Sequence, residues 1–241
     1  TIKEIGDITG GQAVGDPSAL VTGVSIDSRS IDKNKLFVPI KAKRNGHDFV
    51  SDAIRNGATG HLFSEGKPQG NAVKVNDTLI ALQDLAKFER KRITGDVIGI
   101  TGSVGKTTTK DILFASLRNL TEVHVSKLSF NNELGLPLTI LSAESSTKHL
   151  ILEMGARGPG QIAELTKIAT PTIGIVTRVA SAHTEFFQDI DHIAETKGAL
   201  VELLPSSGTA ILNNDDPRVA EMSKRTNAEI VTYGCLLYTS D

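Results

Sequence analysis

The chain has 241 residues, of which 39% are apolar and 22% are charged. This length is ample for a buried core and suits one large domain or two modest ones. The 26 basic and 28 acidic residues give a formal net charge of −2, so the chain lacks the overall positive field that holds a nucleic-acid backbone. A single cysteine excludes a disulfide framework and a zinc site built from cysteines, and it fits a reducing compartment.

The sequence predicts neither a membrane span nor a signal peptide. No run of 18 apolar residues occurs, which excludes a membrane-spanning helix of ordinary length. The first residues lack the basic-then-apolar plan of a signal peptide, and because they also lack Met we expect a short N-terminal stretch to be missing. We therefore expect a soluble, cytoplasmic α/β protein, and we take a monomer as its state.

The N-terminal part alternates short strand-like runs with turns and helical patterns. A charged cluster at 87–92 and Gly95 mark a boundary, so we predict a first domain over residues 1–92. The strand-like runs are 21–26 and 35–40, and the helical patterns are 49–56 and 78–92.

From residue 93 to residue 234 the pattern changes to strand followed by helix, repeated. The predicted strands are 97–100, 122–125, 149–154, 172–179, 209–212 and 229–233. The predicted helices are 106–119, 137–142, 160–168, 191–204 and 217–224. Strands that are apolar on both faces, with helices between them, predict a mostly parallel, doubly wound sheet covered on both sides. Residues 235–241 have no clear period, and we interpret them as an atypical tail.

A glycine-containing loop between the first strand of this domain and the helix after it indicates a phosphate site. Glycines let backbone N–H groups face a polyphosphate, and the helix N-terminus adds partial positive charge. Lys106 would reach the β- and γ-phosphates, and the Thr107 hydroxyl would ligate Mg²⁺. The match departs from the strict phosphate-loop pattern because Ile100 stands at the first glycine position. The alternative is a strand-to-helix turn that binds nothing.

Three polar residues lie at or beyond the carboxyl ends of other predicted strands, where parallel sheets bind their ligands. Glu153 is a candidate Mg²⁺ ligand or a solvated strand end. His183 is a candidate site residue or an ordinary surface histidine. Lys197 falls on the apolar face of its predicted helix, either extending its amine to solvent or turned toward a site.

Asparagines and aspartates cluster after two further strands. Asn131 and Asn132 either cap the next helix or hold a polar substrate. In the run 213–217, capping by Asp216 with Pro217 at the first helical position explains part of the pattern.

Several motifs together resemble the Mur ligase family. The resemblance runs through 101–108, 131–139 and 152–162, then through Ala182-His183, the helix of Lys197, and 212–217. The first motif is shared across the family, whereas the second and third resemble the branch that adds D-alanyl-D-alanine to UDP-N-acetylmuramoyl-tripeptide. In the N-terminal part, Asp27-Ser28-Arg29 is similar to the family's uridine-contacting segment, and 46–49 to a motif that follows it.

The resemblance implies an ATP-dependent acid–D-amino-acid ligase of peptidoglycan synthesis, active in cell-wall biogenesis, cell shape and cell division. It implies ATP and Mg²⁺ as cofactors, with a small UDP-substrate-binding domain preceding an incomplete central ATPase domain. The substrate-binding residues implied are Ser28, Arg29, Asn131 and Asn132. The ATP-binding residues implied are Thr101, Gly102, Ser103, Val104, Gly105, Lys106, Thr107 and Thr108.

The family's catalysis implies two cations. Thr107 and Glu153 would bind one, and His183 with a carbamylated Lys197 would lie around the second. Lys106, Lys197 and His183 are thus the implied catalytic residues. The tripeptide carboxylate would attack the γ-phosphate to give an acyl phosphate, which the amine of D-alanyl-D-alanine would convert to an amide.

Two departures from the family qualify this resemblance. Residues 177–181 replace an expected Asn-Val-Gly-like segment and place Arg178 at a strand end. The chain is also much shorter than the three-domain family, so we expect it to lack the C-terminal domain and to be a weak or inactive fragment. The alternatives are a folylpolyglutamate-type ligase, which would lack the UDP-binding module, and a non-catalytic nucleotide-binding module, which would need no second-metal ligands.

Overall fold

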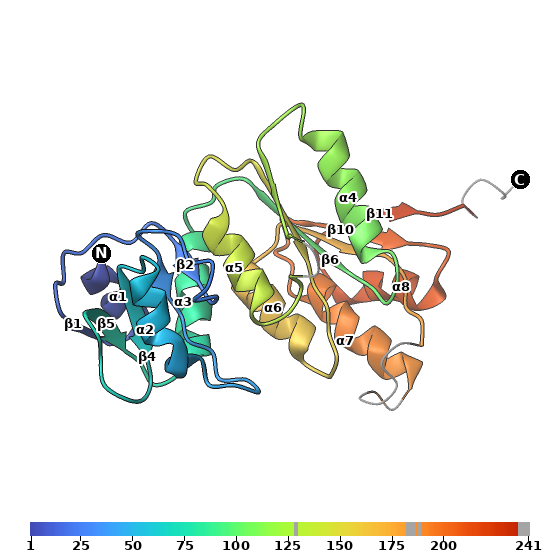
Figure 1. Cartoon of the computed structure of the whole chain (residues 1–241). Helices are drawn as coiled ribbons and strands as arrows, with labels where there is room; N and C mark the ends of the chain where they lie inside the picture. The colour runs from blue at the N-terminus through green and yellow to red at the C-terminus, as the bar shows by residue number, and fades with distance from the viewer. Residues whose placement is uncertain (128–129, 182–186, 188, 236–241) are drawn as a thin grey trace, which may run out of the picture. The chain divides into compact units, whose positions relative to one another are not determined.

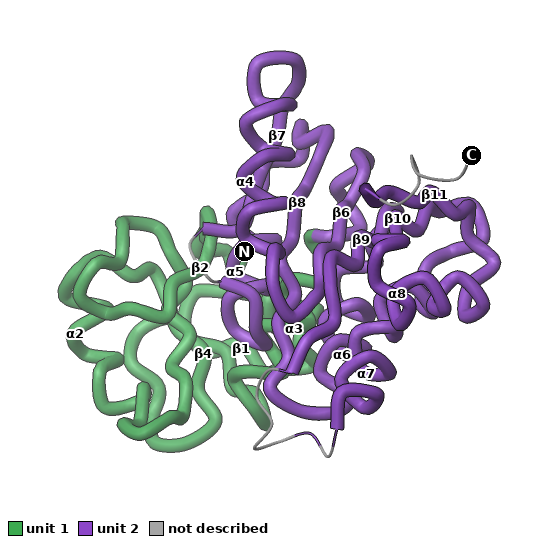
Figure 2. Tube along the Cα trace, turned by 90° about the vertical axis from the view of Figure 1, so that its right-hand side faces the viewer, with its two compact units in different colours: residues 1–89 green, residues 90–241 purple. Residues whose placement is uncertain are grey.

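The computed structural model describes residues 1–127, 130–181, 187 and 189–235. The chain divides into two compact units, Thr1–Glu89 and Arg90–Asp241 (Figure 2). The division falls at 89–90, slightly before the boundary expected from the charge cluster. Arg90 explains this, because its buried guanidinium donates to the carbonyls of Ile93, Ala169 and Thr170, all in the second unit.

Unit 1 is a small α/β unit with a five-stranded sheet, in the order β1-β5-β4-β3-β2. Only the β1–β5 pair is antiparallel; the other pairs are parallel. In chain order its elements are α1 (Ile2–Thr9), β1 (Gln12–Val14), β2 (Val24–Ser25), β3 (Leu36–Phe37), η1 (Gly46–Phe49), α2 (Val50–Arg55), β4 (Gly60–Phe63), β5 (Asn71–Lys74) and α3 (Thr78–Arg90). The two strands expected at 21–26 and 35–40 are therefore present but only two residues long.

Helix α1 has the terminal chemistry that starts and stops a helix. The Thr1 hydroxyl accepts from the Glu4 backbone N–H, and the Glu4 carboxylate binds the N-terminal amine in return. This reciprocal capping box satisfies donors that a first helical turn leaves open. The helix ends at Gly10, whose left-handed φ of 61° suits glycine.

Unit 2 has a six-stranded sheet in which every strand pair is parallel, as the strand–helix pattern predicts. The strand order is β11-β10-β9-β6-β8-β7. Its strands are β6 (Asp96–Thr101), β7 (Val123–Val125), β8 (His149–Glu153), β9 (Ile173–Val176), β10 (Thr209–Asn213) and β11 (Glu229–Tyr233). Its helices are α4 (Lys106–Leu117), α5 (Gly135–Ser142), α6 (Gln161–Ala169), α7 (Ile190–Glu202), α8 (Pro217–Glu221) and η2 (Met222–Arg225).

The two faces of this sheet are covered by different helices (Figure 1). Ile98, Ile100 and Ile151 form a buried cluster with residues of α4 on one face. On the other face, the strand residues Val176 and Leu212 pack with residues of α7, α8 and η2. Apolar residues thus point to both faces of the same strands, which is the expected composition of a parallel sheet with two helical layers.

The topology makes the end of β6 the natural binding position. Strand β6 lies between β8 and β9, and the chain fills one side of it with β7 and β8 before crossing to β9 on the other. Connections that leave a strand in opposite directions open a crevice at its carboxyl end. The loop after β6 therefore lies at the switch point of the sheet.

None of the helices in the described part of the chain combines the length and the apolar character needed to cross a membrane.

Unit 1 contains a buried histidine that the fold holds neutral. His61 in β4 is 1% exposed, its Nδ1 lies 2.9 Å from the Leu62 carbonyl oxygen, and its Nε2 accepts from the Gln69 backbone N–H. An Nε2 that accepts a hydrogen bond carries no proton, so the ring is the neutral tautomer. Burial accordingly lowers the pKa of His61 below its ordinary value.

We predict that unit 1 loses stability as the pH falls. The unfolded chain binds a proton at His61 near pH 6.5, whereas the folded chain resists it, so the stabilisation present above that pH is lost below it. NMR titration should give His61 a lower pKa than His192, whose pKa is raised by its hydrogen bond to Asp189. Urea unfolding of unit 1 should occur at lower urea at pH 5 than at pH 7.5. Titration of His61 at or above His192 would contradict this.

Candidate active site

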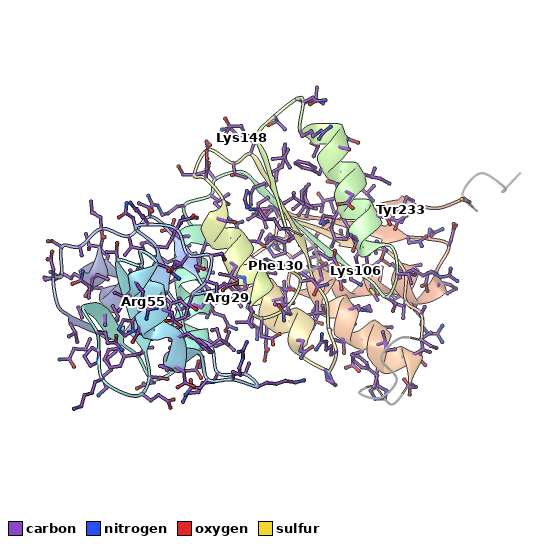
Figure 3. The ribbon with its side chains drawn as sticks, viewed as in Figure 1. Arg29, Arg55, Lys106, Phe130, Lys148 and Tyr233 are labelled. Carbon is purple, nitrogen blue, oxygen red and sulfur yellow. The ribbon has the colours of Figure 1, made fainter. Side chains whose placement is uncertain are left out.

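The phosphate loop turns through two glycines in conformations that other residues rarely adopt. Gly102 has φ +149° and Gly105 has φ +89°. Gly105 precedes α4 and offers no side-chain cap, so the first N–H groups of the helix stay open to a ligand. Open N–H groups and the partial positive charge of a helix N-terminus together form an anion site. Lys106, the first residue of α4, lies at this point (Figure 3).

The end of β9 supports the loop from beneath. The Thr177 hydroxyl donates to the Val104 carbonyl at 2.7 Å. The Ser103 backbone N–H donates to the Arg178 carbonyl at 2.6 Å, and the Ser103 hydroxyl donates to the Ala180 carbonyl at 2.9 Å. A Cβ on Gly102 would lie 1.9 Å from the Thr177 oxygen, so only glycine fits above this threonine.

The Lys106 side chain folds back over the phosphate loop. Its Nζ donates to the Gly102 carbonyl at 2.8 Å. The pKa of Lys106 is lowered by burial, and the negative charge of Glu153 opposes part of this shift. The amine therefore lies between the loop and a carboxylate, where the phosphates of a nucleotide would be its natural partners.

Glu153 is the buried carboxylate at the centre of the site. It ends β8 and pairs in register with Ile100 of β6, so it lies level with the start of the phosphate loop. Its exposed fraction is 2%. Oε2 accepts from the Thr107 hydroxyl and Oε1 accepts from the Asn131 side-chain amide, each at 2.9 Å. Side chains from two segments that are distant in sequence thus converge on the carboxylate at the end of β8.

The Thr107 and Glu153 oxygens suit a hard cation. Hydroxyl and carboxylate oxygens are the ligands that Mg²⁺ takes, and Mg²⁺ usually keeps several waters and substrate phosphates besides one or two protein ligands. Within the described ranges no group of three His, Cys, Asp or Glu side chains surrounds a potential metal position. The Thr107 and Glu153 oxygens therefore fit a cation whose other ligands are water and nucleotide phosphates.

The two neighbouring asparagines do different things. Asn131 binds Glu153, as described, and a Cβ on Gly155 would lie 3.0 Å from its side chain. The Asn132 side-chain oxygen accepts from the backbone N–H of Gly135, the first residue of α5, at 2.9 Å. Asn132 thus contacts the start of α5 without being its N-cap, which is Leu134, and its role toward substrate remains a prediction.

Lys197 is turned inward. It is 5% exposed on α7, and burial together with the charge of Lys106 lowers its pKa to about 8. One turn later Leu200 packs so closely on the sheet that a Cβ on Gly99 would lie 2.9 Å from it. This close approach holds the face of α7 that carries Lys197 against the strands. His183, expected beside Lys197, lies outside the described residues.

Among the remaining predicted residues, Thr101 and the polar run at 213–217 have structural contacts. The Thr101 hydroxyl donates to the Met154 carbonyl, whereas Val104 and Thr108 are exposed. The polar run after β10 is explained by two contacts: Asp216 caps α8 and accepts from the Val179 N–H, and the Asn213 amide donates to the Thr177 carbonyl.

The Asp27-Ser28-Arg29 segment lies in unit 1. The Arg29 guanidinium forms a two-point ion pair with Asp27 and holds the pKa of that carboxyl at about 2. Ser28 is buried, and its carbonyl accepts from the Asn56 side chain. The pair leaves the Arg29 side chain largely exposed (Figure 3).

Sequence reasoning missed Thr177 as part of the site. The sequence places it in a predicted strand and at the start of the segment 177–181, which departs from the expected family segment, and assigns it no role. A hydroxyl at the end of a buried apolar strand is the signal that could have found it.

A parallel, doubly wound sheet with a glycine loop, a lysine and a buried carboxylate at its switch point is the arrangement typical of phosphate-loop proteins. A sequence model of the family described as "Mur ligase middle domain" matches residues 100–236. The chain belongs to the Mur ligase family.

Individual relatives agree with this assignment. The chain is 40% identical to the UDP-N-acetylmuramoyl-tripeptide–D-alanyl-D-alanine ligase of Mycobacterium tuberculosis strain H37Rv, over 96% of this chain and 51% of that protein. It is 35% identical to the Bacillus subtilis ligase of the same name, over 97% of this chain and 52% of that protein. The chain thus spans about half the length of the curated relatives that it matches.

Solved structures give the same picture. The crystal structure of MurF ligase from Thermotoga maritima in complex with ADP matches with a TM-score of 0.82 and 35% identity, over 90% of this chain and 51% of that one. A crystal structure of MurF from Acinetobacter baumannii matches with a TM-score of 0.91 and 26% identity, over 97% of this chain and 53% of that one.

We predict that Gly102→Ala damages the nucleotide site. The new Cβ would collide with the Thr177 oxygen at a backbone conformation unsuited to alanine, so unit 2 should lose about 2 kcal/mol of stability and ATP affinity should fall. Urea unfolding and calorimetric ATP titration measure the two effects. Gly158→Ala is the matched control, because Gly158 has ordinary φ and no atom within 4 Å of an added Cβ. Equal behaviour of the two variants would contradict the prediction.

Proposed function

We propose that this chain carries the UDP-substrate-binding and ATP-binding parts of a ligase that joins D-alanyl-D-alanine to UDP-N-acetylmuramoyl-tripeptide. The names of its relatives support this substrate pair. The observation that carries the proposal is the Thr107–Glu153 contact beside the phosphate loop, which joins a nucleotide site to a hard-cation site. The reaction belongs to the cytoplasmic stage of peptidoglycan synthesis and so to cell-wall growth and cell division.

ATP would bind with its phosphates on the loop. The backbone N–H groups around Gly102–Gly105 and the start of α4 would hold the phosphate oxygens. Lys106 would exchange its bond to the Gly102 carbonyl for the β- and γ-phosphates. Thr177 would keep the loop in shape while the lysine moves.

Thr107 and Glu153 would hold Mg²⁺, which supplies charge neutralisation of the phosphates when bound. Asn131 would keep the Glu153 carboxylate turned toward Thr107.

The reaction that this site would support has two steps. A carboxylate oxygen of the tripeptide attacks the γ-phosphorus, and the bond from that phosphorus to the β-phosphate oxygen breaks. ADP departs, and the tripeptide carries an acyl phosphate. The amine of D-alanyl-D-alanine then attacks the acyl carbon, releases phosphate and a proton, and leaves an amide. Lys106 and the loop N–H groups stabilise the charge that develops on the transferred phosphoryl group.

We propose that Lys197 is carbamylated and, with His183, lies at a second cation. A carbamate is a hard oxygen ligand, and it forms from carbon dioxide and a neutral amine. Burial and the lowered pKa of about 8 enlarge the neutral fraction of Lys197 near neutral pH, which favours that reaction.

A carbamate at Lys197 should be visible by ¹³C NMR in ¹³C-bicarbonate. We expect one carbamate resonance that grows as the pH rises toward about 8, because the neutral amine becomes more abundant. Lys197→Arg should abolish the resonance, whereas the control Lys127→Arg, at an exposed lysine, should leave it unchanged. A bare amine at Lys197, or an unchanged spectrum in Lys197→Arg, would contradict the assignment.

Binding of the acceptor substrate tests the proposed function. Calorimetric titration should show saturable binding of UDP-N-acetylmuramoyl-tripeptide, with Ser28 and the exposed Arg29 of unit 1 contributing to it. Arg29→Ala should weaken this binding, and Arg55→Ala, at another exposed arginine of unit 1 with an acidic partner, is the control. Mg·ATP binding should be unaffected by either change.

The alternatives predict different results. A non-catalytic nucleotide module would bind Mg·ATP but not the UDP-linked peptide. A folylpolyglutamate-type ligase would likewise ignore the UDP-linked peptide and would take a glutamate-like substrate. Absence of acceptor binding at millimolar concentration would therefore overturn the proposed substrate, even if ATP binds.

A further inference from the structure

A second lysine of α4 is buried and has no part in the site described above. Lys110 lies one turn after Lys106 and is 4% exposed. Lysines are rarely buried unless their amines are bound. The Lys110 Nζ donates to the Ser126 carbonyl at 3.1 Å and lies 3.3 Å from the carboxylate of Asp111. Its side chain thus extends from α4 to the segment that follows β7.

Ser126 links this lysine to the backbone of Glu153. It directly follows β7 and is 1% exposed. Its backbone N–H donates to the Ile151 carbonyl at 3.1 Å, and its hydroxyl accepts from the Glu153 backbone N–H at 3.3 Å. The residue held by Lys110 is therefore itself bound to the strand end that carries the site carboxylate.

Helix α4 also holds the carboxylate itself. It contributes Thr107 to one oxygen of Glu153, while Asn131 binds the other. Lys110 follows Thr107 by three residues, and residues at this spacing lie close along one side of a helix. The Lys110–Ser126 bond thus joins α4, which carries Thr107, to the residue whose hydroxyl binds the Glu153 backbone.

We propose that Lys110 is a positioning residue that fixes α4 against the segment after β7 and so orients Glu153 for the cation of Mg·ATP. The inference rests on the proposed function, in which Thr107 and Glu153 hold that cation. It assigns Lys110 no contact with nucleotide or metal. Groups that orient metal ligands are typically worth about 10-fold or more in metal affinity.

The test compares Lys110→Met with Lys127→Met. Both changes remove one positive charge near the segment after β7, but Lys127 is exposed. ATP binding is titrated against Mg²⁺ concentration and also measured in EDTA. We expect Lys110→Met to need about 10-fold more Mg²⁺ for half-maximal effect, with unchanged affinity for metal-free ATP. Lys127→Met should match the unchanged protein in both measurements.

Hydrogen exchange gives a readout that does not depend on nucleotide. In the ligand-free protein, Lys110→Met should accelerate amide exchange at Ser126 and Glu153 while β6 keeps its protection. Unchanged exchange together with unchanged Mg²⁺ dependence would overturn the inference. If the unchanged protein fails to bind Mg·ATP, the proposed function fails, and the exchange result still decides whether Lys110 holds this segment.

Ser126→Ala is a second variant that tests the inference if Lys110→Met does not fold. It removes only the hydroxyl that accepts from the Glu153 N–H and keeps the carbonyl that Lys110 binds. We expect Ser126→Ala to raise the Mg²⁺ concentration for half-maximal effect by a smaller factor than Lys110→Met does. The double variant should raise it by less than the product of the two single factors. If Lys110→Met does not fold, an unchanged Mg²⁺ dependence in Ser126→Ala would overturn the inference.

Discussion

The site depends on one buried carboxylate and the two donors that hold it. A carboxylate taken out of water is costly unless its oxygens are bound, so Glu153 needs Thr107 on one oxygen and Asn131 on the other. This requirement fixes α4, the end of β8 and the loop before α5 relative to one another. The phosphate loop precedes α4 directly, so its open N–H groups face the same place as the carboxylate.

The sheet makes this arrangement possible through its strand order and its glycines. Because β6 lies where the connections diverge, the loop after it has β8 on one side and β9 on the other. Strand β8 supplies Glu153, and Thr177, the residue directly after β9, supports the loop. Gly99 lets Leu200 approach the sheet, which places Lys197 against the strands on the opposite face from α4. In the proposed function, binding groups from both helical layers would therefore meet at one end of the sheet.

The sequence was most informative where periodicity and loop chemistry agree. The parallel sheet of unit 2, the phosphate loop and Glu153 as a site candidate follow from apolar strands that end in glycine or polar residues. It was least informative where a contact joins residues distant along the chain. Thr177 and Lys110 look like ordinary strand and helix residues until the fold places them beside Val104 and Ser126. In unit 1, strands of two residues are too short for period-two alternation to define their ends.

A crystal structure with ADP and Mn²⁺ tests the central claim most directly, because Mn²⁺ replaces Mg²⁺ at oxygen sites and is located by its anomalous signal. The account predicts an anomalous peak bonded to the Thr107 hydroxyl or the Glu153 carboxylate and to the ADP phosphates, with those phosphates on the N–H groups of Gly102–Gly105. Nucleotide bound away from this loop, or a cation that contacts neither Thr107 nor Glu153, would contradict it.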